Sequence, residues 1–320
     1  MIRRAVIGAA CLLSMQAVAS AQSWPARPIR AIIPFGAGSA TDIVPRIVFE
    51  QLSSQLGQPI VVENRTGAGG TLGTSAVAKA DPDGYTLLAH SNAFSVAPAI
   101  YANLPYDTER DFAAIAPFCT LPVVLVISPS KGFKTIQEMV AAAKAKPGTF
   151  NYASIGVGSG THLSAERLKL GAGFDAVHIP FRGGPEALTE IIAGRVDFYF
   201  CPINTALPLI RNGQLVALVT NGDVRAPELP EVPTTLEAGY RDADFPIWIG
   251  MLAPAQTPRS IIDRLHTETI KAIQVPATLE RLAKTGVTPM IMTPAEFEAR
   301  INAQITSNIA IARAAGIKPN

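Results

Sequence analysis

The chain has 320 residues, 48% of them hydrophobic, with 27 basic and 25 acidic side chains. A leader at 1–21 carries two of the basic residues and no acid, so the remainder has no net charge and no basic face for nucleic acid or membrane is expected. Beyond the leader only Cys119 and Cys201 remain, too few for a disulfide framework, and both are expected to be buried small hydrophobes.

The leader has the features of an export signal. Arg3 and Arg4 precede an apolar stretch, and Ala19-Ser-Ala21 fits the small-residue pattern at which such signals are cleaved. Cys11 lies inside the apolar stretch without the leucine expected upstream of a lipidated cysteine, which favours cleavage near Ala21 over a lipid anchor. Beyond the leader no apolar run approaches the ~20 residues that span a bilayer.

Short apolar strands alternate with longer helical patterns from Trp24 onward. Strands are expected at 31–34, 59–63, 85–89, 152–155, 176–180, 196–200 and 215–220, and helices at 43–52, 71–80, 135–146, 162–170, 186–193, 205–211, 260–273, 279–284 and 294–315. This alternation predicts an α/β fold in which mostly parallel sheets are flanked by helices.

Two apolar stretches divide the chain into two domains. The stretch 121–127 is expected to carry the chain into a second domain, and 245–252 is expected to bring it back. The first domain is therefore predicted to be discontinuous, comprising 22–122 plus 245–320, and the second to comprise 123–244.

One arrangement recurs, in which a strand is followed by a loop of glycine and small hydroxyl residues and then by a helix. It is found at 36–42, 66–71, 156–161 and 183–186, and in weaker form at 91–92 and 202–205. The carboxyl ends of parallel strands meet at one edge of a sheet, so these loops should converge on a cleft between two sheets. Free amide hydrogens and helix dipoles there favour an anion such as a carboxylate.

Nucleotide binding and catalysis find less support. No lysine lies between Met1 and Ser75 to complete a phosphate loop, and the dinucleotide pattern Gly36-Ala-Gly38-Ser-Ala-Thr41 lacks its third glycine. Gly158-Ser159-Gly160 is not a nucleophile elbow, because valine precedes it, and none of the four histidines belongs to a metal-binding HExxH motif. We therefore expect no enzyme activity, no metal and no cofactor.

Two side chains near the loops leave alternatives open. His162 follows Thr161, where it is suited either to a hydrogen bond with a ligand or to packing at a helix start. Arg182 lies in Phe-Arg-Gly-Gly, where it is suited either to clamping a carboxylate or to exposure in solvent.

Several motifs in order resemble one family over the whole chain from about Trp24. These are Trp24-Pro-Ala-Arg-Pro-Ile-Arg30, Pro34-Phe35 with Thr41-Asp42, Val61-Val-Glu-Asn-Arg65, Gly67-Ala-Gly-Gly70, Pro82-Asp-Gly-Tyr-Thr86, Asn151-Tyr-Ala-Ser154 and 314–319. They resemble the periplasmic solute-binding proteins of tripartite tricarboxylate transporters, the Bug family.

The resemblance implies a monomeric, two-domain Venus-flytrap protein of the periplasm. Such a protein captures a small carboxylate, either a di- or tricarboxylate or an aromatic acid, and delivers it to membrane permease subunits. The alternatives are a ligand-loaded sensor that contacts a kinase and, with less support, an exported hydrolase or nucleotide enzyme.

The resemblance also implies the ligand contacts, residue by residue. They fall on Phe35, Gly38, Ser39, Thr41, Asp42, Ala68, Ser91 and Asn92 in the first domain, and on Ser159, Gly160, Thr161, His162 and Arg182 in the second, with Cys201 and Asn204 nearby. The family commonly has Pro-Gly-Gly where this chain has Ala37-Gly38-Ser39, and an acid where it has Cys201. A neutral residue at 201 favours a plain carboxylate over an amino acid as ligand.

Overall fold

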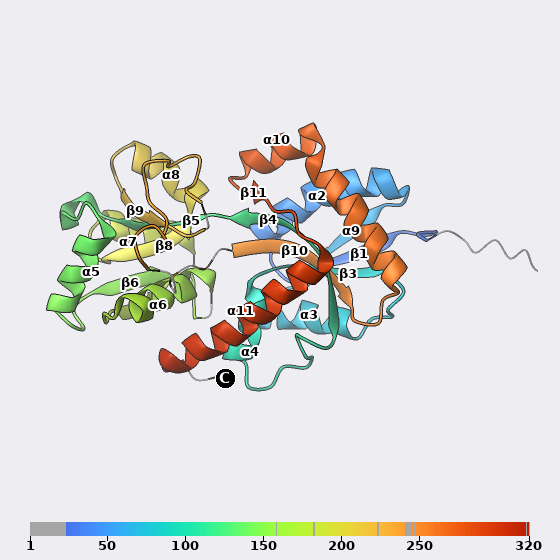
Figure 1. The fold of residues 1–320 in the computed structure, drawn as a ribbon, viewed down its shortest axis with the longest axis horizontal. Coiled ribbons are helices and arrows are strands. Elements are labelled where there is room, and N and C mark those ends of the chain that lie inside the picture. Colours follow the sequence, from blue (N-terminus) through green and yellow to red (C-terminus); the bar gives the residue numbers. More distant parts are fainter. Residues whose placement is uncertain are drawn as a thin grey trace, which may run out of the picture.

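The computed structural model describes residues 24–157, 159–181, 183–222, 224–240, 243, 245, 247–317 and 319. The predicted leader lies outside these residues. Two lobes lie side by side, each built on one sheet, and two segments of chain run between them (Figure 1). Within the described part of the chain, no helix is both long and apolar enough to cross a membrane.

The first lobe contains the larger sheet, whose six strands lie in the order β11, β4, β10, β3, β1, β2. These strands are β1 (Ile29–Ile33), β2 (Ile60–Asn64), β3 (Thr86–Ser91), β4 (Phe112–Leu121), β10 (Ile247–Pro254) and β11 (Thr288–Pro289). One face packs on α2 (Ala40–Leu56), α9 (Arg259–Gln274) and α10 (Pro276–Lys284). The other packs on α3 (Thr71–Ala78), α4 (Ala93–Ile100) and α11 (Pro294–Ala314), with η1 (Ala68–Gly70) leading into α3.

The second lobe contains a five-stranded sheet in the order β7, β6, β8, β5, β9. These strands are β5 (Val123–Ile127), β6 (Asn151–Ser154), β7 (Val177–Pro180), β8 (Phe198–Pro202) and β9 (Val216–Thr220). Helices α5 (Ile136–Ala145) and α6 (Gly160–Ala172) cover one face, whereas α7 (Gly184–Ile192) and α8 (Ile203–Arg211) cover the other. A short turn, η2 (Pro129–Lys131), follows β5.

Two stretches of chain connect the two sheets. Strand β4 ends at Leu121 in the first sheet and β5 begins at Val123 in the second, while β10 returns the chain from Ile247. The exact domain bounds stay a prediction, but every strand of the smaller sheet falls within 123–220.

The sheets are mixed rather than mostly parallel. In the larger sheet β1 is parallel to β2 and β3, but β10 is antiparallel to β3 and β4, and β11 to β4. In the smaller sheet β6 is parallel to β7 and β8, but β5 is antiparallel to β8 and β9. The expectation fails at the crossing strands because β4, β5 and β10 are not joined to their neighbours by the strand–helix–strand units that enforce parallel pairing.

Polar side chains fix where several helices begin. The Thr293 hydroxyl accepts a bond from the backbone N–H of Glu296, whose carboxylate accepts from the N–H of Thr293, so α11 opens with a complete capping box. The Thr135 hydroxyl caps α5 by accepting a hydrogen bond from the backbone N–H of Glu138. These bonds satisfy amide hydrogens that have no partner inside the helix.

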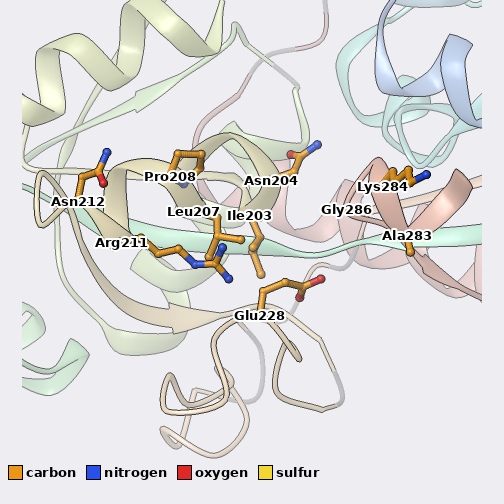
Figure 2. A pocket seen from close by; sticks show the side chains of 10 residues that line it. All are labelled: Ile203, Asn204, Leu207, Pro208, Arg211, Asn212, Glu228, Ala283, Lys284 and Gly286. Atoms are coloured by element: carbon orange, nitrogen blue, oxygen red, sulfur yellow. The ribbon is translucent and has the colours of Figure 1, made fainter. Parts of the chain in front are cut away.

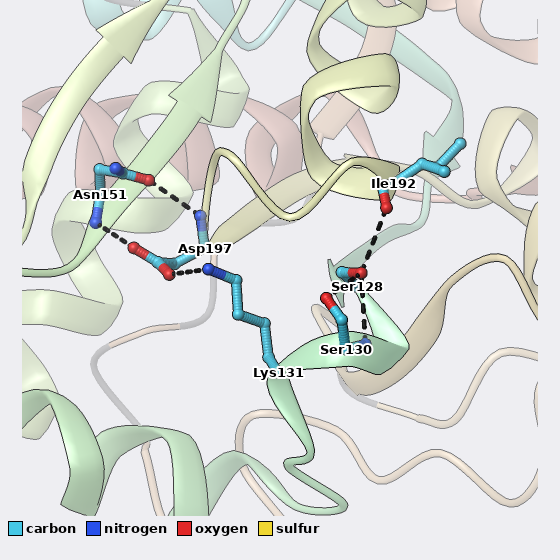
Figure 3. Close-up of polar contacts among 6 residues, drawn as sticks. All are labelled: Ser128, Ser130, Lys131, Asn151, Ile192 and Asp197. Atoms are coloured by element: carbon cyan, nitrogen blue, oxygen red, sulfur yellow. Dashed lines mark hydrogen bonds and ion pairs between the residues drawn. The ribbon is translucent and has the colours of Figure 1, made fainter.

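A polar cluster ties together the starts of β6 and β8 in the second sheet (Figure 3). The Asp197 carboxylate accepts from the ammonium of Lys131 at 2.5 Å and from the backbone N–H of Asn151 at 2.8 Å. The N–H of Asp197 in turn donates to the Asn151 side chain at 2.9 Å. The Asp197 side chain therefore fixes the starts of β6 and β8 and the turn after β5.

We expect Asp197→Ala to lower the stability of the second lobe by about 1 to 3 kcal/mol, because it leaves a half-buried ammonium and a backbone N–H without their acceptor. Urea denaturation measures this loss. Asp175→Ala is the matched control, since the carboxylate of Asp175 is 70% exposed and 3.9 Å from Lys169. An equal effect of both substitutions would contradict the role given to Asp197.

Candidate functional site

The glycine-rich loop after β1 is organised around Asp42. Its carboxylate accepts from the backbone N–H of Gly38 at 2.9 Å, from the Asn64 amide at 2.8 Å and from the Arg46 guanidinium at 2.9 Å. Burial alone raises the pKa of Asp42, but these three hydrogen bonds outweigh burial and hold the pKa below its ordinary value. Asp42 thus shapes the loop with both carboxylate oxygens already hydrogen-bonded, and its role as a ligand contact stays a prediction.

Aromatic packing closes the loop against the neighbouring strand. The ring of Phe35 packs edge-on against buried His90, with centroids 5.1 Å apart. Gly70 lies beside them with a positive φ of 97°, and a Cβ atom there would lie 3.3 Å from Nε2 of His90. Only glycine fits this backbone conformation without strain, which explains one glycine of the predicted loop. Ala68, which the resemblance places among the ligand contacts, has an exposed side chain.

The other first-lobe residues lie at helix starts. Ser39 is the residue before α2, but its hydroxyl makes no capping bond, and Thr41 lies half-buried in the first turn. The Ser91 hydroxyl accepts from the N–H of Ala93 at 3.4 Å, and Asn92 immediately precedes α4. The carboxyl ends of β1 and β3 therefore place these residues at one edge of the sheet, as predicted.

In the second lobe, Ser159 and Thr161 organise the loop that leads into α6. The Ser159 hydroxyl donates to the carbonyl of Gly156 at 2.7 Å and accepts from the N–H of His162 at 3.3 Å, which caps the helix. The Thr161 hydroxyl lies 3.0 Å from that of Ser159 and accepts from the N–H of Ile155 at 3.2 Å. Burial raises the pKa of the nearby Tyr199 hydroxyl, and Thr161 partly offsets this by lowering it.

The two lobes meet at Asn92 and Gly160. A Cβ atom at Gly160 would lie 3.0 Å from Cδ1 of Ile247 and 3.9 Å from the amide nitrogen of Asn92, so the helix start of α6 approaches the first lobe closely. The amide nitrogen of Asn92 and the hydroxyl of Ser39 are both buried and have no hydrogen-bond partner within the described part of the chain. Most buried polar groups in folded proteins have a hydrogen-bond partner, so each one without a partner needs an explanation.

His162, in the first turn of α6, belongs to a cluster of aromatic and charged side chains. Its ring stacks on that of His178 with centroids 4.0 Å apart, and Tyr152 stacks on His178 at 5.0 Å. The Tyr152 hydroxyl donates to Glu166, which also pairs with Lys169 at 2.9 Å. A cavity of about 450 Å³ adjoins this cluster and is lined by Val157, His162, Glu166, Lys169, His178, Ala315 and Ile317.

Burial keeps three histidines neutral in the folded state. It lowers the pKa of His90 from 6.5 to about 4 and, together with the charges of His178 and Lys169, that of His162 from 6.5 to about 3. Burial lowers the pKa of His178 as well. The unfolded chain therefore binds protons near pH 6 that the folded chain does not.

We expect stability to be fully present above pH 6.5 and to fall as the pH decreases from 6.5 toward 4, because protons then bind preferentially to the unfolded chain. Denaturant titrations at a series of pH values measure this dependence. His90→Phe keeps an aromatic ring in the pocket and should flatten the slope between pH 6.5 and about 4. A slope unchanged by that substitution would show that His90 does not titrate as inferred.

Cys201 and Asn204 have surroundings that differ from those of the glycine-rich loops, and their role as ligand contacts stays a prediction. Cys201 has no exposed surface and lies among apolar side chains of the second lobe, where burial raises the pKa of its thiol. Asn204 is exposed and donates its amide to the carbonyl of Thr285 at 2.8 Å, across the lobes. Arg182 lies outside the described residues.

Asn204 instead lines a cavity of about 450 Å³ between α8 and the end of α10 (Figure 2). Its walls are Ile203, Asn204, Leu207, Pro208, Arg211, Asn212, Glu228, Ala283, Lys284 and Gly286. A Cβ atom at Gly286 would lie 2.6 Å from that of Asn204, so the two lobes are in close contact here too.

Comparison with known proteins identifies the family. The model of a family described as "Tripartite tricarboxylate transporter family receptor" matches residues 44–317. The chain belongs to this receptor family. Its members are periplasmic binding proteins, not enzymes. Among curated relatives, Protein BugT of Bordetella pertussis is 35% identical over 301 residues, which cover 93% of this chain and 92% of that protein.

Two solved structures show the same fold. MatC of Rhodopseudomonas palustris with bound malate is 30% identical, with a TM-score of 0.74 over 90% of this receptor and 99% of that chain. An R. palustris protein solved with adipate is 28% identical, with a TM-score of 0.78 over 93% of this receptor and 100% of that chain. The periplasmic binding protein fold expected from the sequence is thereby confirmed.

Several residues that shape the receptor's site escaped prediction. Asn64 and Arg46 hold Asp42, Tyr199 lies beside Thr161, and Ile247 closes against Gly160. An amide side chain at a strand end is a usable signal for Asn64, which lies in the motif Glu63-Asn64-Arg65. Tyr199 and Ile247 carried no signal, because both lie within apolar strands.

Proposed function

We propose that the receptor captures a small carboxylate between its two lobes and delivers it to the membrane permease of a tripartite tricarboxylate-type transporter. The ligand class is a di- or tricarboxylate or an aromatic acid. Export through the leader at 1–21, with cleavage near Ala21, places the receptor in the periplasm, where such a ligand is available.

The single observation that carries the proposal is the buried amide nitrogen of Asn92 without a partner, 3.9 Å from the Cβ position of Gly160 in the opposite lobe. A buried donor left without an acceptor costs about 1 to 3 kcal/mol, so an acceptor supplied by a ligand recovers this free energy. The hydroxyl of Ser39, which also has no partner in the described chain, adds a second polar group on the first-lobe side.

The start of α6 supplies the opposite wall. This helix of 13 residues begins at Gly160, and its free amide hydrogens and dipole favour a negative charge at that end. Glycine at 160 lets the backbone of α6 approach the side chains of Ile247 and Asn92, where a Cβ atom would lie 3.0 Å from Ile247. The relatives solved with malate and adipate support a carboxylate as the charged group.

Position 201 no longer argues for a plain acid over an amino acid. Cys201 is wholly buried, so it has no surface to offer a ligand's ammonium group. The choice among carboxylates therefore rests on binding measurements.

A thermal-shift screen against malate, adipate, benzoate and aspartate tests the proposal. A ligand at roughly 100 times its dissociation constant adds ~2.7 kcal/mol of stability, which raises the melting temperature by several degrees. At least one plain carboxylate should do so, with methyl esters of the same acids as matched neutral controls. Equal shifts with acids and esters, or none with any carboxylate, would contradict carboxylate capture.

A further inference from the structure

A buried chain of hydrogen bonds links the two lobes behind the candidate site. It begins at Arg167 on α6 of the second lobe, whose guanidinium donates to the side-chain carbonyl of Asn308 on α11 at 3.0 Å. Asn308 donates its amide to the backbone carbonyl of Ser95 on α4 at 3.1 Å. The Ser95 hydroxyl donates to the carbonyl of Asn92 at 2.7 Å.

This chain is sheltered from water. Asn308 and Ser95 have no exposed surface, and Arg167 is 8% exposed. The guanidinium of Arg167 also lies 4.8 Å from the ring centre of Phe245 and donates to the Ser307 hydroxyl at 3.0 Å. Hydrogen bonds from a charged donor in such surroundings are strong and directional.

This chain of hydrogen bonds from Arg167 through Asn308 and Ser95 to Asn92 is called the bridge. The helices that carry the bridge also share an apolar cluster. Side chains of α4, α6 and α11 pack together with Phe245, and α11 extends from the first lobe to lie beneath α6 (Figure 1). Helix α11 therefore contacts both lobes, and its polar residues lie between the two helices whose first turns contain the candidate site.

A second contact fixes the first-lobe end of the bridge. The Gln304 carbonyl of α11 accepts from the indole N–H of Trp248 at 2.7 Å and lies 3.2 Å from the Ser95 hydroxyl oxygen. The backbone N–H of Asn92 donates to the carbonyl of Trp248 at 3.1 Å. Asn92 is thus held by its backbone on two sides, which leaves its side chain facing α6.

We propose that Arg167 and Asn308 are positioning residues that set the affinity of the carboxylate site without touching the ligand. The bridge holds the start of α6 against Asn92, so the ligand does not have to pull the lobes into this arrangement from a separated one. If only a fraction of the molecules adopts the binding-competent arrangement, the apparent affinity for the ligand is reduced in proportion to that fraction. This inference rests on the proposed carboxylate site.

The test uses Arg167→Met, which keeps the stem and removes the guanidinium, and Asn308→Leu, which keeps the approximate shape and removes the amide. Affinity for malate or adipate, measured by calorimetry, should fall about tenfold in each variant. Arg167→Lys retains the charge but loses the fork of donors, so it should recover part of the affinity. Arg195→Met removes an exposed arginine of the same lobe, paired with Glu190, and should bind like the parent protein.

The double variant separates positioning from general damage. If both residues act through one bridge, Arg167→Met combined with Asn308→Leu should bind no more weakly than the weaker single variant. Additive losses, or a lower melting temperature with unchanged affinity, would overturn the proposal. Small-angle scattering without ligand provides an independent measure, since Arg167→Met should increase the radius of gyration and Arg195→Met should not.

The scattering comparison remains decisive if neither malate nor adipate binds the parent protein. That result would count against the proposed function, whereas the bridge would still be supported by expansion of Arg167→Met. An unchanged radius of gyration in Arg167→Met would overturn the bridge whatever the ligand.

Discussion

A Cys201→Asp variant should lose about 3 to 5 kcal/mol of stability at neutral pH, the cost typical of an uncompensated buried charge. Cys201 has no exposed surface, and its neighbours are apolar side chains such as Val124, Tyr199 and Ala206. A carboxylate at this position must either remain charged without a counter-ion or bind a proton, and both reduce the stability of the folded state. Urea denaturation at pH 7 measures the loss.

Two further measurements identify the cause. Cys201→Ala introduces no charge and should cost clearly less than Cys201→Asp. The deficit of the aspartate variant should also shrink as the pH falls toward 4, because the carboxyl group then becomes neutral. A Cys201→Asp protein as stable as the parent at pH 7 would show that position 201 is accessible to solvent or ligand, as the family resemblance implied.

The second large effect is expected for Asn92→Leu, which should weaken carboxylate binding about 10- to 100-fold without lowering the stability of the ligand-free protein. The loss reflects a hydrogen bond to a charged acceptor, worth about 1.5 to 3 kcal/mol. Stability should hold or rise, because the amide nitrogen that is removed has no partner in the described chain. Calorimetry and thermal unfolding of the same preparation measure the two quantities.

Asn64→Leu is the matched control for this substitution. The Asn64 amide donates to Asp42 at 2.8 Å and to the carbonyl of Phe35 at 2.9 Å, so its removal should destabilise the first loop. The two variants should therefore differ in opposite ways, with affinity lost at position 92 and stability lost at position 64. If Asn92→Leu bound malate and adipate like the parent protein, Asn92 would not be a ligand contact.

The sequence predicts most of the fold because local patterns determine the elements. Helix α5 begins after Thr135 and ends near Pro147, and α11 begins at Pro294 after a capping threonine, in each case within a residue or two of the expected bounds. The mixed pairing of the sheets was missed because strand direction depends on how the chain crosses between lobes, which the residues of β4, β5 and β10 do not encode.

The same distinction between local pattern and long-range arrangement applies to the candidate site. Loops at strand ends were placed well, because the position of a loop such as 156–161 follows from its neighbours in the chain. Cys201 is a buried small hydrophobe, as expected, but which face of β8 it lies on was not predictable, because β8 is apolar on both faces and the alternation that separates Phe198 and Phe200 from Tyr199 and Cys201 leaves no mark in the sequence.

Contacts between distant segments lay beyond prediction for a different reason. The bond from Asn204 to Thr285 joins residues 81 positions apart, and that from Arg167 to Asn308 joins residues 141 apart. No spacing rule relates such pairs, since both contacts depend on how the second lobe sits against the first.

A crystal structure of the receptor with whichever of malate and adipate gives the larger thermal shift tests the central claim most directly. We expect one carboxylate oxygen about 2.7 to 3.2 Å from the amide nitrogen of Asn92, with the ligand enclosed between that residue and the start of α6. Density for the ligand in the cavity between α8 and α10, with none at Asn92, would contradict the account.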